Sequence, residues 1–333
     1  MGKATLRSSL FFFSTETMST NYLDVRDYEW QVVINPNACE KKCLKYWQPV
    51  SELLTQNGIK YTLHQADAIG KGIDVARQLC AEGHRYLIAV GGDGTLNEVV
   101  NGILQSGVDA KEVYLAVLPL GRGNDWARTH KFSTENRENV SIFTEGKFMR
   151  HDVGKVKTCN GETEISGRYF INIAGFGFDA EVIYDVTHNK PHFLGISVYI
   201  LSLIRTIFSF RSQPVRIQAP EFQFNDKTFL MVAAICQYNG GGMRQAPMAV
   251  PDDGFMDVVV VPKVSNWTVF KNFKKIFSGD HIHTIKNIKT CKTDYLEVSS
   301  TDLLRSEVEG ELLTTGNYKI EVIPGALNVL TNL

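Results

Sequence analysis

A regular alternation of apolar strand-like runs and helix-like segments in the first half of the chain restricts the fold most. The runs recur about every 27 residues, over residues 31–34, 59–63, 86–90 and 113–118. Between them, apolar residues recur at helical spacing, and Gly58 and Gly83 stand where helix-terminating glycines are expected. Such alternation predicts a parallel sheet covered by helices. We therefore expect an α/β domain over residues 29–150, with ligands beyond the carboxyl ends of its strands.

The pattern changes at about residue 151, beyond which strand-like runs predominate. They cover residues 168–174, 214–218, 228–236, 256–261, 295–298 and 318–322, with helix-like segments at 193–210 and 266–278. Short strands with few helices are typical of an antiparallel β domain. We expect a β-sandwich second domain over residues 151–323.

Composition and charge exclude several classes of protein. With a net charge of -1, nothing in the overall charge indicates binding to nucleic acid. The six cysteines form no CxxC pair and have no histidine ligands near them in the sequence, which predicts reduced thiols in a cytosolic protein, with neither a zinc site nor a disulfide framework. Residues 1–28 contain too short an apolar run for a signal peptide, so we expect a disordered leader. The apolar stretch 193–210 includes Arg205 and is too short to span a bilayer, which predicts a buried or surface-docked helix.

The sequence GGDGTLNE, after the strand expected at 86–90, forms the first candidate site. Its three glycines let backbone N–H groups approach a ligand closely. Thr95 and Glu98 have the spacing of a capping box, which predicts a helix N-terminus directed at the same ligand. The carboxylate of Asp93 would repel a bare polyphosphate but would attract Mg²⁺ that arrives with the phosphates. The loop therefore indicates a metal–nucleotide complex.

A second loop of the same kind, LPLGRGND, follows the strand expected at 113–118. Gly121 and Gly123 again permit a tight approach, and Asn124 and Asp125 end the loop. Carboxyl ends of neighbouring parallel strands meet at one edge of a sheet. We therefore expect Asp93 and Asp125 to lie close together.

Five motifs, in order along the chain, resemble those of the diacylglycerol kinase-like lipid kinases. They read GGDGTLNEVVNGI, LPLGRGNDWAR, GFGFDAEV, GGGMRQAPMAVPDDGFMDV and VEGE. The resemblance covers nearly everything after Glu29. It implies a nucleotide-binding α/β domain, a β-sandwich lipid domain, and a C-terminal segment, 324–333, that returns to the first domain through a strand at 326–330. It also implies ATP and Mg²⁺, a lipid hydroxyl as acceptor at a membrane surface, a cytoplasmic protein that binds membranes peripherally, and a homodimer as in some relatives.

The resemblance further assigns roles to single residues. Glu311 matches the proposed proton acceptor of the family, with Asp93 as the second choice, and Asp125 joins Asp93 in a network of metal and water. A structural Mg²⁺ site is expected at Asp253 and the carbonyls of Val250 and Phe255. Contacts to the nucleotide are expected from Asn35, Gln65, Gly91, Gly92, Asp93, Gly94, Thr95, Leu96, Asn97, Glu98, Gly121, Arg122, Gly123 and Asn124.

Four positions depart from the family pattern. The loop after Asn35 lacks the usual glycines, so either its lysines face the phosphates instead or the loop binds nucleotide less closely. Arg122 replaces a threonine and either clamps a phosphate oxygen, the alternative we favour, or obstructs the adenosine side. Gln65 stands near the position of a nucleotide-contacting threonine, and Glu309 replaces an aspartate before Gly310-Glu311.

Two other functions share part of this pattern. A kinase of a soluble acceptor such as NAD also carries a GGDGT loop, but the GRGND and PDDGFMD segments argue against it. A non-catalytic lipid or nucleotide sensor would suit the altered first loop, but it would not need the retained carboxylates. Among lipids, diacylglycerol, a sphingoid base, a ceramide and phosphatidylglycerol all offer a primary hydroxyl.

The segment 263–292 is a candidate for membrane contact. It carries seven lysines and two histidines against one acid, Asp280. Aromatic residues at 267, 270, 273 and 277 recur at helical spacing. The pattern predicts either a helix lying on an anionic membrane or, the alternative we favour, a core-facing stripe beside a solvated lysine face.

Overall fold

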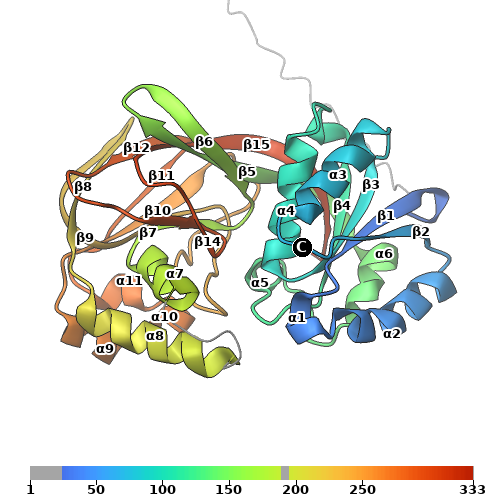
Figure 1. The fold of residues 1–333 in the computed structure, drawn as a ribbon, viewed down its shortest axis with the longest axis horizontal. Coiled ribbons are helices and arrows are strands. Elements are labelled where there is room, and N and C mark those ends of the chain that lie inside the picture. The colour runs from blue at the N-terminus through green and yellow to red at the C-terminus, as the bar shows by residue number, and fades with distance from the viewer. Residues whose placement is uncertain (1–24, 189–194, 333) are drawn as a thin grey trace, which may run out of the picture.

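The computed structural model describes residues 25–188 and 195–332, which form two lobes side by side (Figure 1). The first lobe is the expected α/β domain. Its elements are η1 (Val25–Asp27), β1 (Glu29–Ile34), α1 (Ala38–Lys41), α2 (Cys43–Gln56), β2 (Lys60–Gln65), α3 (Lys71–Ala81), β3 (Tyr86–Gly91), α4 (Asp93–Leu104), η2 (Ala110–Glu112), β4 (Tyr114–Pro119), α5 (Asp125–Thr129), η3 (Glu138–Ser141) and α6 (Ile142–Glu145).

The strands of this lobe form a parallel sheet in the order β2-β1-β3-β4. β3 shows why its sequence is an unbroken apolar run. Leu87 and Ala89 pack with α3 and α4 in one core cluster, while Ile88 and Val90 pack with α2 in another. A strand buried on both faces needs no polar alternation, which holds for β1, β3 and β4, whereas β2 is a largely exposed edge strand.

The start of the lobe lies slightly before the predicted boundary. Val25 is buried, and its carbonyl accepts a hydrogen bond from Trp30 Nε1 at 2.9 Å. The rest of the expected leader, residues 1–24, lies outside the described residues.

The second lobe is built from antiparallel strands, with helices at one end (Figure 1). Its elements are β5 (Lys147–Asn160), β6 (Thr163–Phe170), β7 (Ile173–Gly177), α7 (Phe178–His188), α8 (Gly195–Ser209), β8 (Gln213–Ala219), β9 (Phe222–Ala234), β10 (Met256–Pro262), α9 (Asn266–Asn272), α10 (Lys275–Ser278), α11 (His281–Thr284), β11 (Lys289–Thr293), β12 (Tyr295–Ser299), β13 (Ser306–Val308), β14 (Glu311–Leu312) and β15 (Asn317–Thr331).

Two boundaries in this lobe differ from the prediction. The run expected at 168–174 is divided, since β6 ends at Phe170 and β7 begins at Ile173. The helix expected at 266–278 is likewise two short helices, α9 and α10. Both runs are apolar enough to read as continuous, because the turn inside each run carries no glycine or proline.

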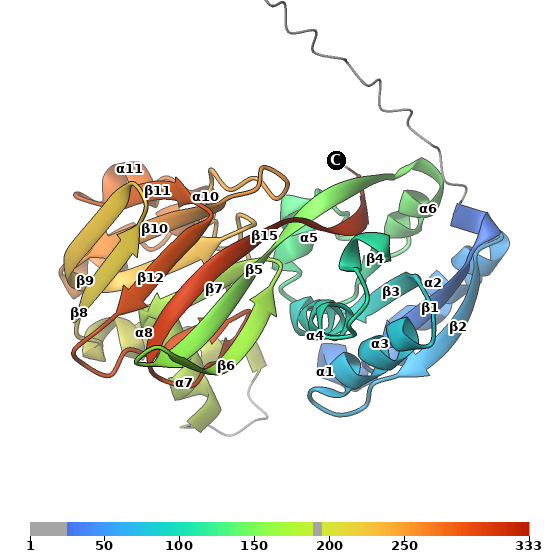
Figure 2. The same ribbon diagram turned by 90° about the horizontal axis from the view of Figure 1, so that it is seen from above.

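Two long strands, β5 and β15, join the lobes (Figure 2). They pair antiparallel over nearly their whole length, with a shift in register between Ile323 and Leu327. In the second lobe β15 pairs with β12, and in the first it lies parallel to β4 at Asn328 and Val329. The C-terminal strand therefore lies beside β4 of the first lobe.

Candidate functional site

The two glycine-rich loops meet at the carboxyl edge of the parallel sheet. A Cβ atom placed on Gly121 would lie only 2.4 Å from the Cα of Gly92, so any side chain there would separate the loops. The amides of Leu120 and Gly121 both donate to the carbonyl of Gly91, at 2.7 and 3.0 Å. The glycines therefore allow one backbone to lie directly against the other.

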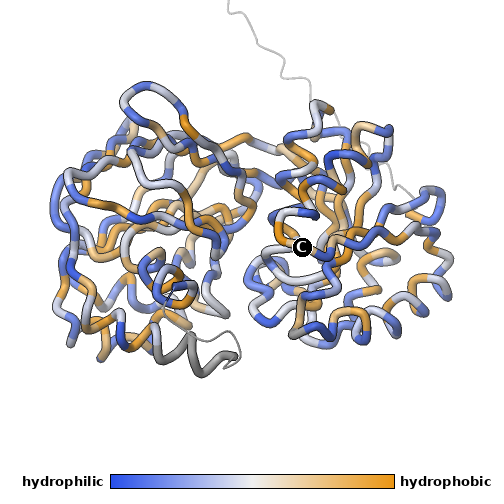
Figure 3. The backbone as a smooth tube through the Cα atoms, viewed as in Figure 1, coloured by the Kyte–Doolittle hydropathy of each residue, from blue (hydrophilic) through white to orange (hydrophobic). Residues whose placement is uncertain are grey.

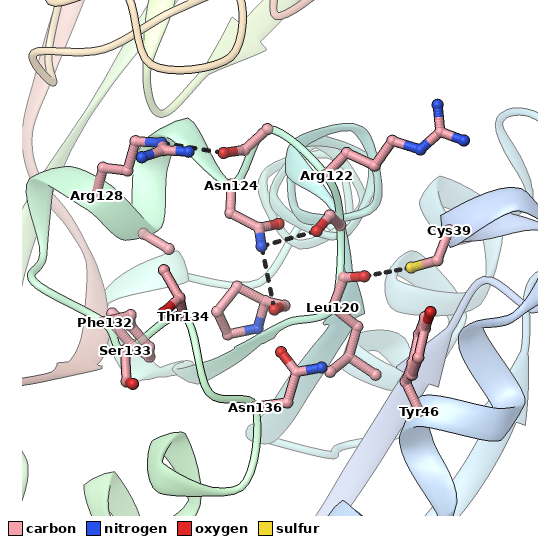
Figure 4. Close-up of a pocket in the computed structure, with 14 residues that line it drawn as sticks. Cys39, Tyr46, Leu120, Arg122, Asn124, Arg128, Phe132, Ser133, Thr134 and Asn136 are labelled. Atoms are coloured by element: carbon pink, nitrogen blue, oxygen red, sulfur yellow. Dashed lines mark hydrogen bonds between the residues drawn. The ribbon is translucent and has the colours of Figure 1, made fainter. Parts of the chain in front are cut away.

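Beside the second loop lies a cavity of about 370 Å³, within the size range of small-molecule sites (Figure 4). Within it, Asn124 Nδ2 donates to the carbonyls of Pro119 and Gly121 at 3.2 and 2.9 Å, which fixes the loop. The cavity is lined by Cys39, Tyr46, Pro119, Leu120, Gly121, Arg122, Gly123, Asn124, Ala127, Arg128, Phe132, Ser133, Thr134 and Asn136.

The first loop leads directly into α4, and Asp93 is the first residue of that helix. Its Oδ1 accepts a hydrogen bond from the amide of Trp126 at 3.1 Å. Its Oδ2 lies 3.0 Å from where a Cβ of Gly123 would stand. Burial raises the pKa of Asp93 against several backbone hydrogen bonds. The carboxylate thus occupies the angle between the two loops, as the sequence predicts.

The predicted capping box is wrong, because α4 begins at Asp93 with Gly92 as its N-cap and without a side-chain cap. Glu98 instead accepts hydrogen bonds from the amides of Gly70 and Gly72, at 2.8 and 2.9 Å. These amides lie at the N-terminus of α3, where the helix dipole favours a negative charge. Glu98 therefore stabilises the packing of α3 on α4.

Asp125 connects the two lobes. Its Oδ2 and Oδ1 accept hydrogen bonds from the amides of Gly241 and Gly242, at 2.7 and 2.6 Å. Both glycines have positive φ, 84° and 103°, in a conformation that side chains disfavour. Burial and the nearby charge of Asp93 raise the pKa of Asp125 to about 6, against those hydrogen bonds. Asp125 lies beside Asp93, as expected, but its oxygens face a loop of the second lobe.

Glu309 lies in the same group of carboxylates. Its Oε1 accepts hydrogen bonds from the amides of Ile171 and Asn172, at 2.7 and 2.8 Å. Its Oε2 is buried and has no hydrogen-bond partner among the described residues. Burial above all, and the charge of Asp93 in addition, raise the pKa of Glu309 to about 8. From the sequence alone, Glu309 was noted only as a departure from the family pattern. The buried position of its carboxylate near Asp93 makes it a candidate site residue.

Glu311, the first choice for the base, is engaged with a cation. Its Oε2 lies 2.7 Å from Nη1 of Arg168, and the Glu311 side chain is 40% exposed. The same guanidinium donates to Oδ1 of Asn97 from Nε and Nη2, at 3.0 and 2.7 Å. Arg168 therefore holds Glu311 and α4 in fixed relation. The sequence alone did not identify Arg168 as a site residue, because a single charged residue within a strand is common and carries no functional signal.

The other predicted residues fall into three groups. Gly94 is exposed at the loop surface, whereas Thr95, Leu96, Asn97 and Glu98 are buried within α4. Asn35 directly follows β1, and Gln65 is the last residue of β2, at the same sheet edge. Arg122 is exposed and extends toward Cys39 (Figure 4); a hydrogen bond with Cys43 and then the charge of Arg122 lower the pKa of Cys39 against burial.

The expected metal site at Asp253 has a different occupant. Oδ2 of Asp253 is paired with Nζ of Lys292 at 2.5 Å, and Oδ1 accepts the amide of Phe255 at 3.1 Å. Val250 and Phe255 are 40% and 43% exposed. A divalent cation at Asp253 would have to displace the ammonium group, so this donor set does not fit Mg²⁺ well. Asp93 and Glu309 fit better, because a cation would satisfy the buried Oε2 of Glu309.

The second lobe contains an apolar cavity that the sequence did not predict. Its wall includes one acid, Asp179, whose Oδ2 accepts Nε2 of Gln245 at 2.6 Å. Burial raises the pKa of Asp179 to about 6, against that hydrogen bond. The cavity is lined by Phe178, Asp179, Phe229, Leu230, Met243, Val261, Val269, Asn272, Phe273, Ile276, His281 and Ile285.

Glu307 lies near Asp179 and gives a prediction on stability. Burial and the charge of Asp179 raise the pKa of Glu307 to about 8, against hydrogen bonds from Gly310 and Asn239. The folded protein therefore binds the extra proton between the usual glutamate pKa and pH 8, so stability present at low pH is lost as pH rises through 8. We expect Glu307→Gln to unfold less readily than wild type at pH 9, by on the order of 1–3 kcal/mol, and to differ little at pH 5.

Urea unfolding of both proteins at pH 5, 7 and 9 measures this difference, with the exposed Glu162→Gln as the control. Equal stabilities at pH 9 would contradict a buried, charged Glu307.

Comparisons with known proteins agree with this architecture. Residues 29–156 match the diacylglycerol kinase catalytic domain, and residues 172–331 match the YegS C-terminal NAD kinase beta sandwich-like domain. The diacylglycerol kinase of Bacillus subtilis is 27% identical, over 84% of this chain and 89% of its own. A Chromohalobacter salexigens protein called "Probable lipid kinase YegS-like" is 28% identical, over 78% and 79%.

The fold has solved counterparts. A crystal structure of a diacylglycerol kinase from Bacillus anthracis str. Sterne superimposes with a TM-score of 0.68 at 19% identity, covering 91% of this chain and 97% of that one. At that identity the similarity concerns the fold. Among the described residues, no helix has the length and apolar character needed to cross a membrane.

Proposed function

The chain belongs to the diacylglycerol kinase-like lipid kinases, and we propose that it transfers the γ-phosphoryl group of ATP to a lipid hydroxyl. One observation supports this proposal most. The carboxylates of Asp93, Asp125 and Glu309 lie close together where the two glycine-rich loops face the second lobe. Phosphoryl transfer needs alignment and charge neutralisation more than covalent chemistry.

Each part of the site has a role in this proposal. ATP occupies the cavity beside the second loop, with its phosphates against the backbone of both glycine-rich loops. Arg122 and Arg128, which line that cavity, supply positive charge toward the phosphates. Asp93 and Glu309 would hold Mg²⁺, which would neutralise charge on the phosphates.

The proton of the attacking hydroxyl needs an acceptor. Of the two candidates, Asp93 is favoured here, because it lies between the two glycine-rich loops that would face the phosphates, and burial raises its pKa above the usual aspartate value. Glu311 is held by Arg168 at 2.7 Å, which suits it to positioning that arginine and, through it, Asn97.

The apolar cavity of the second lobe favours a lipid over a soluble acceptor. Its wall is almost entirely hydrocarbon, which suits the end of an apolar chain, and at about 50 Å³ the cavity would have to widen to take a whole acyl chain. The direct test is transfer of label from ATP by purified protein to a panel of lipids in mixed micelles, namely diacylglycerol, a sphingoid base, ceramide and phosphatidylglycerol, with NAD as the soluble alternative. Label in NAD alone, or in none of these acceptors, would refute the proposal.

The helices at one end of the second lobe provide a surface for membrane contact. Trp267, Phe270 and Phe208 touch one another through their rings, and they are 61%, 44% and 51% exposed. Phe277 is 46% exposed, while Phe273 packs on the core. The stripe is thus divided between core and solvent, rather than wholly core-facing as we expected. Lys271 lies 5.9 Å from the Trp267 ring, so positive charge adjoins the aromatic cluster.

We expect the double variant Trp267→Ser, Phe270→Ser to lose binding to anionic vesicles. Removing two exposed aromatic rings from a lipid interface costs on the order of tenfold or more in partitioning. Flotation with vesicles containing phosphatidylglycerol measures the bound fraction. The control is Ile165→Ser, an equally exposed apolar residue on β6, on the opposite side of this lobe (Figure 1). Equal flotation of both variants would place membrane contact elsewhere.

A further inference from the structure

Three potential metal ligands meet in the interior, at the junction of the two lobes. Nε2 of His130 lies 3.1 Å from Nε2 of His151. Sγ of Cys236 lies 3.9 Å from the former and 3.7 Å from the latter. All three residues are fully buried, with exposures of 0%. Neither histidine nor the cysteine has a part in the transfer of phosphate described above.

Hydrogen bonds around His151 set its ring so that one nitrogen lone pair points into the cluster. Nδ1 lies 2.6 Å from the carbonyl of Asp152, an acceptor, so Nδ1 carries the proton. Nε2 is then the unprotonated nitrogen, and it faces both His130 and the indole N–H of Trp126, at 3.1 Å each. A backbone carbonyl that orients a histidine through its other nitrogen is the usual support of a metal-binding imidazole.

His130 cannot satisfy both of its nitrogens within the chain. Nδ1 is buried and has no hydrogen-bond partner among the described residues. If Nδ1 carries the proton, Nε2 directs a lone pair at that of His151, which is repulsive. If Nε2 carries it, two donors compete for the single lone pair of His151, and Nδ1 lies unsatisfied in the interior. Either state is costly for a buried polar group.

We propose that His130, His151 and Cys236 bind one Zn²⁺ ion. Zinc bonds of about 2.0–2.1 Å to nitrogen and about 2.3 Å to sulfur, at near-tetrahedral angles, separate the ligand atoms by roughly 3.3–3.6 Å. The three separations here, 3.1, 3.7 and 3.9 Å, match that within a few tenths of an ångström. The ion turns the facing lone pairs from repulsive to bonding, and three protein ligands leave a fourth position for another donor.

The proton balance of binding follows from the ligands. The thiol of Cys236 donates to the carbonyl of Ile171, at 3.4 Å, and it loses its proton to solvent when the thiolate binds Zn²⁺. His130 binds through Nε2 with its proton on Nδ1, and His151 exchanges the hydrogen bond from Trp126 for the metal bond. One proton is released for each ion bound.

The three ligands come from separate parts of the fold, which gives the ion a structural role. His130 ends α5, directly after the segment that carries Asp125. His151 lies on β5, the strand that joins the lobes, and Cys236 follows β9 of the second lobe. The ring of Trp126 stacks on that of His130, with centroids 4.0 Å apart, and the backbone amide of Trp126 donates to Asp93. Zinc would therefore fix α5, and with it both carboxylates, relative to the second lobe.

The test measures metal directly rather than activity. The full chain is produced in medium with added zinc, dialysed, and analysed for metal; a second batch is produced with Co²⁺ in place of zinc. We expect about one zinc per chain, and in the cobalt protein a sulfur-to-cobalt charge-transfer band with the intense visible absorption of tetrahedral coordination. Cys236→Ser is expected to lose the charge-transfer band and most of the zinc. Cys80→Ser, at a buried cysteine in α3, is expected to retain both.

Wild-type protein that holds neither zinc nor cobalt after dialysis would overturn the proposal, whether or not the variants fold. So would a charge-transfer band that survives Cys236→Ser. His130→Gln adds a second ligand variant, and circular dichroism identifies any variant that loses metal because it is unfolded.

Discussion

Replacing Asp93 with asparagine is expected to reduce kcat by about 10²- to 10⁴-fold without loss of the fold. Asparagine keeps an oxygen that can accept the amide of Trp126, at 3.1 Å in the native protein, so the angle between the loops is preserved. It removes the charge and the proton-accepting oxygen. Since burial raises the pKa of Asp93, loss of that charge leaves thermal stability unchanged or raises it.

Transfer of label from ATP to lipid measures the turnover of Asp93→Asn, and calorimetry measures its unfolding. Asp302→Asn, at an exposed position, is the control for losing a carboxylate outside the site. Turnover within threefold of wild type would end the role of Asp93 in both catalysis and metal binding.

The second large effect is expected at Asp125, whose two oxygens accept the amides of Gly241 and Gly242. Asp125→Ala leaves these two amides of the second lobe without their acceptor, so the loop is free to move from the site. A displacement of about 1 Å in a reacting group is enough for a loss of about 10²-fold in rate. We expect a comparable fall in kcat for the variant.

Hydrogen exchange separates this explanation from a direct role in chemistry. In Asp125→Ala the amides of residues 241 and 242 should exchange faster, while those of β3 and β4 keep their protection. Stability is a poor measure here, because burial raises the pKa of Asp125 to about 6 and removing the charge offsets part of the loss. Unchanged exchange in that loop together with low kcat would instead favour direct contact with metal or phosphate.

The sequence predicted correctly those features of the fold and the site that depend on local sequence pattern. Three of the four runs became β1, β3 and β4, whose buried residues are apolar on both faces of the sheet, and the fourth became the largely exposed edge strand β2. Asp93 and Asp125 were expected together because each follows a neighbouring parallel strand, and Gly123 does bring the two carboxylates close. The return of residues 326–330 to the first lobe was expected from the family resemblance, and β15 pairs with β4 at Asn328 and Val329.

What the sequence did not give depends on partners far apart in the chain. The acceptor role of Asp125 needs Gly241, more than a hundred residues away, and Arg168 gains meaning only from Asn97 and Glu311. Glu98 fits a capping box by spacing, yet its carboxylate turns to the N-terminus of α3. The local sequence shows which hydrogen-bonding side chains are present. Which partner each of them binds depends on the packing of distant parts of the chain.

The pairing of β15 with β4 also has a consequence during synthesis on the ribosome. β4 has β3 on one side, and its other neighbour, β15, follows it in the chain by more than 200 residues. Until β15 has been made, the nascent α/β lobe presents an apolar strand with unpaired backbone groups, the kind of edge at which chains associate wrongly. A chain that stops short of residue 328 would lack the closing strand, and its exposed edge would make it a substrate for chaperones or proteases.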